Sequence, residues 1–350
     1  MIPVNMSTIT AVKNRLLNKG IIKTVRFPRM DRIGSDIVFG WWADLLPKSI
    51  EANREELGIE IRDRFPEVFF CLSDIDSIFC LGFARTYPEL KERMGELSMR
   101  LSHKNIIRYD NARLFAFPHI YTEIDPCFNY SVFLKKELPL EMILTKTLGN
   151  DQAEIKKIME SLRPEDKPNI LPGEIDGKIG TTKLRIKEKK VLYGLVKDPM
   201  MPDEQTGRML NVTRQMVSRS RKELEKKDLL KTVRIPALEG LGVDIIAVLF
   251  INFRPDIDIG ERQESTRALF ANLAAVFTIQ GKDKMLAIFP CMNLGDFKRI
   301  KKKIMEQLTR KGSLLKEPWF KLLSVSEGKI FKDFVFAPYL LNRFEIEMKD

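Results

Sequence analysis

Polar and basic side chains recur at helical spacing in the segment that begins at Arg214. Four of them, at i, i+3, i+4 and i+7, would share one face of a helix: Gln215, Ser218, Arg219 and Lys222. The opposite face would carry Val217, Ser220 and Leu224. Short polar and guanidinium side chains on an exposed helical face can hydrogen-bond to base edges in the major groove of DNA, while cations beside them contact phosphates. The spacing therefore favours a helix that packs on one side and binds nucleic acid on the other.

The positive charge of the chain is concentrated in two windows. The 350 residues carry a formal net charge of +11. Seven basic residues and one acidic residue lie between Lys13 and Arg32, and eight basic and three acidic residues lie between Arg214 and Arg234. These two windows account for the whole excess, so the remainder of the chain is formally balanced. Such a distribution indicates two places that meet an anion, most simply a phosphate backbone.

Both windows contain nearly the same six residues. KTVRFP stands at 23–28 and KTVRIP at 231–236, which is 208 positions later. The match extends beyond the motif, because Gly34 and Asp36 correspond to Gly242 and Asp244 at the same spacing. Self-similarity at a fixed spacing over this length predicts an internal duplication.

The second window has the elements that would position its basic helix. The apolar pattern of 187–199 ends at Pro199, 203–210 is typical of a short second helix, and Thr213 can cap the third helix after a turn. The residues that follow, LLKTVRIPALEGLG, are typical of a β-ribbon wing. The order predicts a winged helix-turn-helix. A charged helix that merely covers a domain is the alternative interpretation.

The residues predicted to contact DNA lie in both copies. Those of the second copy are Arg214, Gln215, Ser218, Arg219, Arg221, Lys222, Lys231 and Arg234. Those of the first copy are Lys13, Asn14, Lys23 and Arg26. The first copy lacks two helices before its turn, so we expect either a start site assigned downstream or a lost reading unit. We therefore expect sequence recognition beside Lys231 and only backbone contacts, or none, beside Lys23.

After each window the pattern predicts the order β-α-β-β-α-β. The fold class expected is α+β, with a winged helix-turn-helix and a ferredoxin-like domain in two tandem copies and the first winged helix truncated. The expected units are a partial winged helix at 1–33, a ferredoxin-like domain at 34–125, a helical and loop connector at 126–186, a winged helix-turn-helix at 187–242, a second ferredoxin-like domain at 243–338 and a C-terminal tail at 339–350.

This order resembles the Lrp/AsnC (feast/famine) transcriptional regulators, whose second half is the ligand-sensing RAM domain. The stretch VTRQMVSRSRKELEKKDLLKTVRIPALEGLGVD resembles that family's recognition helix, wing and domain junction, and VFTIQGKDKMLAIFP resembles its Thr-Gly-x-x-Asp hairpin. The resemblance implies dimerisation through RAM sheets and a small effector, often an amino acid, near that hairpin. Gly281 and Asp283 carry over as effector-binding positions, with plain turn chemistry as their alternative. Two features depart from the family: the duplication, and Asp228 where Gly is common.

The expected function is a cytoplasmic DNA-binding transcriptional regulator built as a pseudo-dimer within one chain. Its partners would be double-stranded DNA and a small-molecule effector, with a homodimer through RAM-like sheets as a further expectation. Two alternatives come from other classes of protein. Siroheme decarboxylases are built on a similar scaffold and rely on His and Arg in a pocket, and winged helices also bind proteins and RNA.

Several classes of site and location are disfavoured by the composition. The four cysteines form no CxxC motif, and the two histidines, His103 and His119, lie far from any motif. We therefore expect no metal site, no cofactor and no catalytic residue, hence not an enzyme. The longest unbroken apolar run, 245–251, is too short to cross a bilayer. A soluble protein of the reducing cytoplasm, with no membrane partner, is expected.

Overall fold

A computed structural model of the chain describes residues 6–34, 37–46, 52–118, 122–125, 182–238, 241–273 and 275–346. Most of the connector expected at 126–186 lies outside the described residues, as does Cys127. The elements of the first half are α1 (Met6–Asn18), β1 (Ile22–Pro28), α2 (Met30–Ile33), β2 (Ile37–Asp44), α3 (Ala52–Ile59) with a π-helical turn η2 (Glu60–Arg64), β3 (Val68–Ser73), β4 (Ser77–Ala84), α4 (Tyr87–His103), the 3₁₀ turn η3 (Tyr109–Asn111), β5 (Arg113–Phe117) and β6 (Glu123–Asp125).

The second half begins with a three-helix unit and then repeats the order of the first. Its elements are α8 (Ile186–Lys197), α9 (Asp203–Leu210), α10 (Arg214–Lys226), β7 (Leu230–Pro236), β8 (Ile245–Asn252), α11 (Ile259–Asn272), β9 (Phe277–Gln280), β10 (Lys284–Cys291), α12 (Leu294–Arg310), β11 (Trp319–Ser324), β12 (Lys329–Asp333) and α13 (Ala337–Phe344).

Elements of the two halves correspond at a nearly constant spacing. The bounds of α1 and α10, of β1 and β7, and of β2 and β8 are each 208 residues apart. The pairs β4/β10 and α4/α12 are 207 apart, which is the one-residue slippage visible in the sequence. The spacing equals that of the two KTVR stretches, so the duplication extends through the whole fold.

Two antiparallel five-stranded sheets form the ferredoxin-like halves. Their strand orders are β12-β3-β4-β2-β5 and β11-β8-β10-β9-β6. The fifth strand of each sheet comes from the other half, because β12 pairs with β3 and β6 pairs with β9. The α+β fold class predicted from the sequence is confirmed, and the exchange of edge strands is an addition to it.

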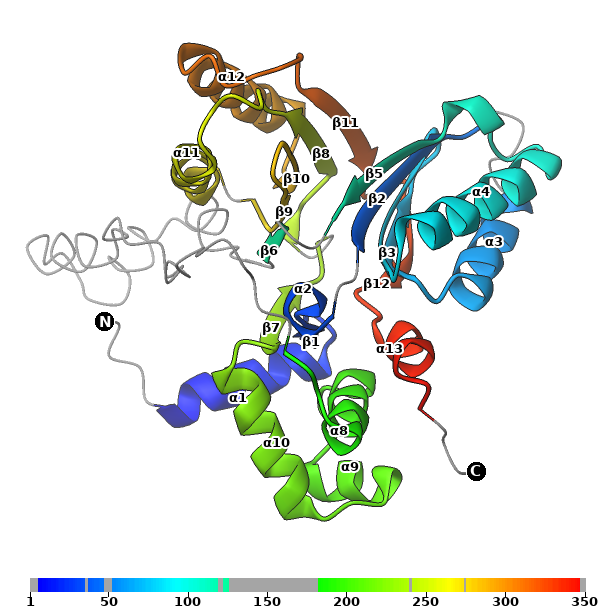
Figure 1. The fold of residues 1–350 in the computed structure, drawn as a ribbon, viewed down its shortest axis with the longest axis vertical. Helices are drawn as coiled ribbons and strands as arrows, with labels where there is room; N and C mark the ends of the chain where they lie inside the picture. Colours follow the sequence, from blue (N-terminus) through cyan, green and yellow to red (C-terminus); the bar gives the residue numbers. More distant parts are fainter. Residues whose placement is uncertain are drawn as a thin grey trace, which may run out of the picture.

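Each sheet is covered on both faces. Helices α3 and α4 lie on the outer side of the first sheet, and α11 and α12 on the outer side of the second (Figure 1). The inner faces pack against each other through aromatic rings: Phe115 lies 4.3 Å from Phe250 and Trp42 lies 5.4 Å from Trp319, measured between centroids. The pairing of RAM-like sheets therefore occurs within one chain. A homodimer through the same sheet faces is not compatible with this packing, because those faces are already buried.

Strands β1 and β7 form a separate two-stranded ribbon between the sheets and the three-helix unit (Figure 1). Val25 lies opposite Val233, and Arg26 lies opposite Thr232. Because Val25 and Val233 are equivalent residues of the two copies, the axis of approximate two-fold symmetry passes between them. The prediction that each KTVR stretch folds into a wing hairpin of its own copy is wrong, because its partner is the same stretch of the other copy.

Helix α13 occupies the first half of the segment predicted to be a tail, 339–350. It packs on α8, and the ammonium of Lys189 lies 5.3 Å from the centroid of the Phe344 ring. Its buried residues Tyr339 and Leu340 belong to the same core as the ribbon and the inner sheet faces. The three-helix unit is thus attached to the rest of the chain by both the ribbon and α13.

Candidate nucleic-acid interface

The helix-turn-helix is held together by small residues at the contacts between its helices. A Cβ on Gly207 of α9 would lie 2.7 Å from the Val212 carbonyl oxygen, so any side chain there would collide with the turn. Asn211 takes the left-handed conformation at φ 55° and ends α9. Thr213 then caps α10, because its hydroxyl accepts a hydrogen bond from the Met216 amide at 3.3 Å. The cap expected at Thr213 is confirmed.

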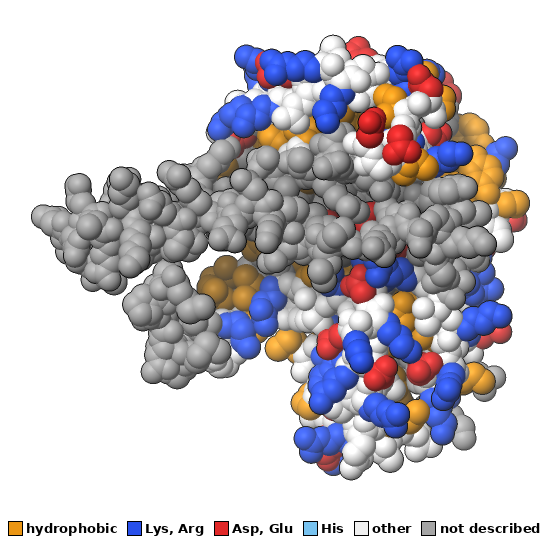
Figure 2. Space-filling view, turned by 60° about the vertical axis from the view of Figure 1, so that its left-hand side comes forward, with side chains coloured by type: hydrophobic (Ala, Val, Ile, Leu, Met, Phe, Trp, Pro, Cys, Tyr) orange, Lys and Arg blue, Asp and Glu red, His pale blue; other side chains and the backbone are white. Residues whose placement is uncertain are grey.

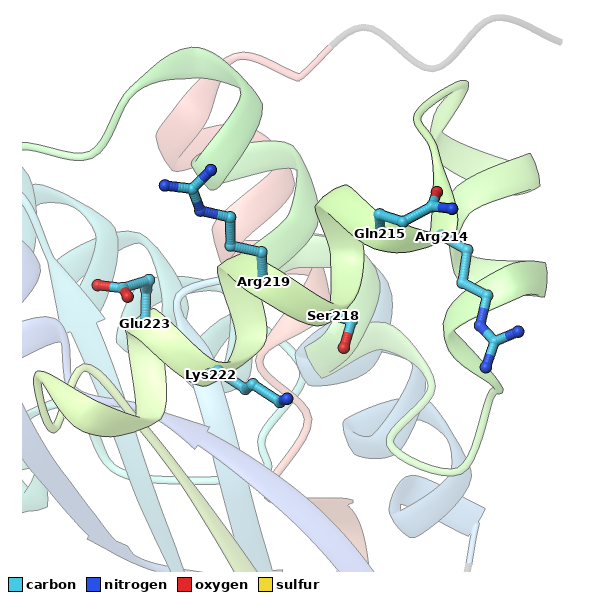
Figure 3. A pocket seen from close by; sticks show the side chains of 6 residues that line it. All are labelled: Arg214, Gln215, Ser218, Arg219, Lys222 and Glu223. Atoms are coloured by element: carbon cyan, nitrogen blue, oxygen red, sulfur yellow. The ribbon is translucent and has the colours of Figure 1, made fainter.

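The inner and outer faces of α10 are those expected from the sequence. Val217, Ser220 and Leu224 are buried against the other helices. Arg214, Gln215, Arg219 and Lys222 are exposed and Ser218 is half-buried. Together with Glu223 they line an open hollow of about 510 Å³, and Figure 3 shows the six side chains extending from α10. The face combines three cations, one carboxylate and two neutral polar groups.

The cations of this face have no carboxylate partner among the residues that the structure describes. Arg214, Arg219 and Lys222 take part in no ion pair there, and their exposed side chains keep them accessible. Figure 2 shows Lys and Arg side chains on the lower end of the molecule, where the helix-turn-helix lies, with Asp and Glu side chains among them and further Lys and Arg at the upper end. An exposed helical face whose cations are not paired is suited to an anionic partner with a groove wide enough for a helix, such as double-stranded DNA.

Arg221 is placed differently from its neighbours on α10. Its guanidinium lies 2.9 Å from the Asp203 carboxylate, and both side chains are mostly buried between α10 and α9. The residue ties the two helices together, so its predicted contact with DNA does not fit its position. Sequence spacing alone could not separate Arg221 from Arg219, because both lie near the edge of the polar face.

The lysines of the two KTVR stretches occupy equivalent structural sites. Lys23 forms an ion pair with Asp333, and its ammonium donates to the Asp333 carbonyl oxygen at 2.9 Å. Lys231 lies 3.6 Å from the Asp125 carboxylate. Asp125 and Asp333 are the last residues of the exchanged strands β6 and β12 and are themselves 208 positions apart. Each lysine thus anchors an exchanged strand, and this equivalence of the aspartates was present in the sequence but was missed.

The two arginines of the stretches differ in environment. Arg26 is 8% exposed, and its guanidinium donates to the Leu195 carbonyl oxygen of α8 at 3.2 Å. Burial lowers the pKa of Arg26, and the nearby charge of Arg221 adds to this effect. Arg234, the equivalent residue, is exposed. The expectation that Arg26 reaches phosphates is therefore corrected, because Arg26 is buried against α8, whereas the equivalent Arg234 is accessible. Lys23 is half-buried and paired with Asp333, and its contact with DNA stays a prediction.

A charge network missed by the sequence analysis joins the first half to the end of α10. Arg29 is 6% exposed at its side chain and pairs with Asp31 at 2.8 Å and with Asp228 at 3.0 Å. Arg32 also pairs with Asp228, at 2.8 Å. The Asp31 carboxylate raises the pKa of Arg29 against the opposing effect of burial. Asp228 takes the left-handed conformation at φ 50°, and its equivalent in the first copy is Gly20 at φ 67°. The departure from glycine is thus explained by the two arginines that hold the side chain.

In the first copy, Lys13 and Asn14 lie on α1, the equivalent of α10. Asn14 is exposed and Lys13 half-buried. Leu16 is only half-buried, whereas the equivalent Leu224 is 3% exposed, because no counterpart of α8 or α9 packs on α1 among the described residues. Leu16 of the first copy is therefore more accessible than its counterpart Leu224 in the second.

The hairpin carrying Gly281 and Asp283 meets the other half of the chain. The Gly281 amide donates to the Lys284 carbonyl oxygen at 2.8 Å, and a Cβ on Gly281 would lie 3.3 Å from the Phe117 ring. The side chain of Asp283 is exposed, while the buried Arg262 donates to the carbonyl oxygen of Lys282. The hairpin thus lies at the contact between halves, where the close approach of the Phe117 ring favours glycine at 281.

No group of three or more His, Cys, Asp or Glu could hold a metal ion in the part of the chain that the structure describes. No described helix has both the length and the apolar composition needed to cross a membrane.

No family model matches the chain, and no curated protein matches it by sequence. Among solved structures, two of the siroheme decarboxylase NirDL align over 98% of this chain with 9% identity. The first covers 91% of that enzyme at a TM-score of 0.48, and the second, in complex with an iron-uroporphyrin III analogue, covers 89% at 0.49. A transcriptional regulator of Neisseria meningitidis bound to L-Met aligns over 40% of this chain and 90% of its own, with 12% identity and a TM-score of 0.32. AsnC of E. coli aligns over 41% and 93%, with 8% identity and a TM-score of 0.31.

These likenesses are of fold alone. They include regulators of the AsnC type over part of the chain and a decarboxylase over nearly all of it. The expectation that the protein is not an enzyme is corrected by this finding, since the chains that align over the whole length are an enzyme.

Proposed function

We propose that the protein binds double-stranded DNA through the outer face of α10 and acts as a regulator of transcription. The observation that supports this most directly is the face itself: Arg214, Arg219 and Lys222 are exposed beside Gln215 and Ser218 and have no described carboxylate partner. A capped helix of this kind fits the major groove, where amide and guanidinium groups can bond base edges and the cations neutralise phosphates.

The proposed mode of binding is asymmetric. The complete helix-turn-helix of the second copy would read one half-site, while Lys13 and Asn14 on α1 and the exposed Arg234 would contact only the backbone. An effector that binds beside Gly281 and Asp283 would act at the contact between the two halves. Both statements rest on the proposed DNA binding and on the positions of these residues in the fold.

The test compares two pairs of exposed cations on the same protein. Fluorescence anisotropy with selected genomic duplexes would measure affinity of the wild type, of Arg219→Ala/Lys222→Ala and of Lys298→Ala/Lys303→Ala. The second pair lies on α12, at the far end of the molecule from α10 (Figure 1), and removes the same charge. We expect the α10 variant to lose roughly tenfold to a hundredfold in affinity and about two units of salt slope. Equal losses of affinity in the two variants would indicate nonspecific electrostatic attraction to DNA. Unchanged affinity in the α10 variant, with no dependence of affinity on salt concentration, would reject the proposal.

An enzyme is the second candidate, and the whole-length alignment to siroheme decarboxylases is what favours it. Its test is independent of DNA. Titration with siroheme under anaerobic conditions, followed by absorbance, would give a stoichiometric spectral change if the chain binds this substrate, and mass spectrometry would detect loss of carbon dioxide from it. Stoichiometric binding with turnover, together with no binding of DNA, would replace the first proposal by the second.

A further inference from the structure

Four side chains form a row across the helix-covered face of the first sheet. Lys332, Cys71, Cys80 and Trp41 are successive partners on β12, β3, β4 and β2. Directly opposed residues of antiparallel strands point to the same face of a sheet. Cys71, Cys80 and Trp41 belong to the core between this sheet and helices α3 and α4, and Lys332 is 3% exposed. Two thiols and one amine are therefore neighbours in a site that is closed to bulk water.

The two thiols are close to the geometry of a disulfide. Their sulfur atoms lie 3.3 Å apart. At the end of this hairpin the Asp74 amide donates to the Ser77 carbonyl oxygen at 2.9 Å, which marks a hydrogen-bonded pair. Counting back through the register, Cys71 and Cys80 form a non-hydrogen-bonded pair, in which Cα atoms are about 4.5 Å apart. This spacing lies within the range of disulfides, so the sulfurs need to approach by only about 1.3 Å.

The fold does not require cysteines at these positions. In the second sheet the corresponding row consists of Asp125, Thr278, Ala287 and Leu249. Thr278 and Ala287 fill the places of the two thiols and support the same strand pairing. The thiol pair is therefore a property of the first half alone, and it needs an explanation other than packing.

We propose that Cys71 and Cys80 are a modification site, at which a small neutral peroxide forms an intrachain disulfide between β3 and β4. One thiol sulfur attacks a peroxide oxygen, which gives a sulfenic acid and releases water. The second sulfur then attacks the sulfenic sulfur, and a second water leaves. In total two thiols lose two electrons and two protons, and one hydrogen peroxide is reduced to two waters.

The environment selects the oxidant by size and charge. Both cysteines are 0% exposed, so a bulky anionic disulfide such as oxidised glutathione cannot reach them, whereas hydrogen peroxide has the dimensions of buried water. Burial raises the pKa of Cys71, while the positive charge of Lys332 opposes this effect. The thiolate is therefore scarce, and we expect oxidation over hours rather than seconds.

The experiment uses the full chain and counts its thiols. Native protein would be treated with hydrogen peroxide or with oxidised glutathione, then denatured, alkylated, digested and analysed by mass spectrometry. With peroxide we expect Cys71 and Cys80 of the wild type to resist alkylation, and the tryptic peptide 65–85, which carries both cysteines, to be lighter by two hydrogen atoms because they are linked. Oxidised glutathione should leave both Cys71 and Cys80 free. Cys80→Ala should abolish the link, and Cys291→Ala should retain it, since Cys291 lies on β10 of the other sheet.

Several outcomes would overturn the proposal. Free thiols after prolonged peroxide treatment would show that Cys71 and Cys80 do not form a disulfide. Sulfinic acids on both residues without a link would show that oxidation occurs but that the second sulfur cannot reach the first. A mixed disulfide between glutathione and Cys71 would contradict selection by size. The wild type carries the main readout, so a substituted chain that fails to fold leaves the test intact.

Discussion

Replacement of the buried Lys332 by methionine should stabilise the protein at neutral pH. The Lys332 side chain lies within the core of the first sheet, and its ammonium donates to the Phe65 carbonyl oxygen at 2.7 Å. Burial lowers the pKa of Lys332 from the ordinary 10.5 to about 8. This difference corresponds to about 3 kcal/mol against the protonated amine in the folded chain.

The direction in which the free energy of unfolding changes with pH follows from the protons bound by Lys332 in the folded and in the unfolded chain. Below pH 8 the amine is protonated in both the folded and the unfolded chain, and the full cost of burying its charge is present. Between about pH 8 and 10.5 the unfolded chain binds more protons than the folded one, so the free energy of unfolding rises with pH. Methionine has similar length and no charge. Its cost is the lost hydrogen bond, about 1 kcal/mol, and Phe65 keeps a second donor in the Val68 amide at 3.1 Å. We expect a net gain of about 2 kcal/mol at pH 7.

The assay is urea denaturation followed by circular dichroism at several pH values from 7 to 10.5. The difference in unfolding free energy between Lys332→Met and wild type should shrink as the pH rises through this window. Lys329→Met is the matched control, because Lys329 is exposed on the same strand. This substitution should change neither the unfolding free energy at pH 7 nor its dependence on pH. A variant that is less stable than wild type at pH 7, or a difference independent of pH, would refute the argument that a buried charge is being removed.

Three further predictions follow from matched positions. Arg26→Met should speed hydrogen exchange of α8, because it removes the guanidinium bond to Leu195, whereas the equivalent Arg234→Met should not; equal effects would contradict the difference in burial. Asp228→Asn keeps a residue that tolerates the left-handed conformation but removes the charge that holds Arg29 and Arg32, and should lower the unfolding free energy by about 1 kcal/mol in thermal or urea melts. Gly82→Ala should cost about 1–3 kcal/mol, since its Cβ would lie 2.6 Å from the Glu67 carbonyl oxygen, while Gly95→Ala, with open space around it, should be neutral or slightly stabilising by the same measurement.

The parts of the fold set by local patterns were predictable from the sequence. The faces of α10 follow from residues three and four apart, and the cap at Thr213 follows from its place before the helix. The order β-α-β-β-α-β and the α+β class follow from runs of apolar residues and turns. The DNA contacts predicted for Arg214, Gln215, Ser218, Arg219 and Lys222 remain proposals, supported by their exposure.

What the sequence could not supply depends on long-range partners. Arg26 and Arg234 both follow Lys-Thr-Val, yet one is buried and the other exposed, because α8 is present on one side of the symmetry axis alone among the described residues. The exchange of β6 and β12 likewise depends on which sheet edge a strand meets. The spacing between Asp125 and Asp333 was an available signal, since it equals that of Lys23 and Lys231.

The exchanged strand β12 has a consequence for biosynthesis. Strand β3 leaves the ribosome about 260 residues before its partner β12. At roughly 5–20 residues per second, the first sheet would expose an unpaired hydrophobic edge for about 10–50 s during translation. The ribbon imposes a similar delay, because β1 cannot pair until β7 has been made. The first half is therefore the part of the nascent chain most dependent on chaperones, and substitutions that weaken β12 should reduce the yield of folded protein in cells more than they reduce its stability once folded.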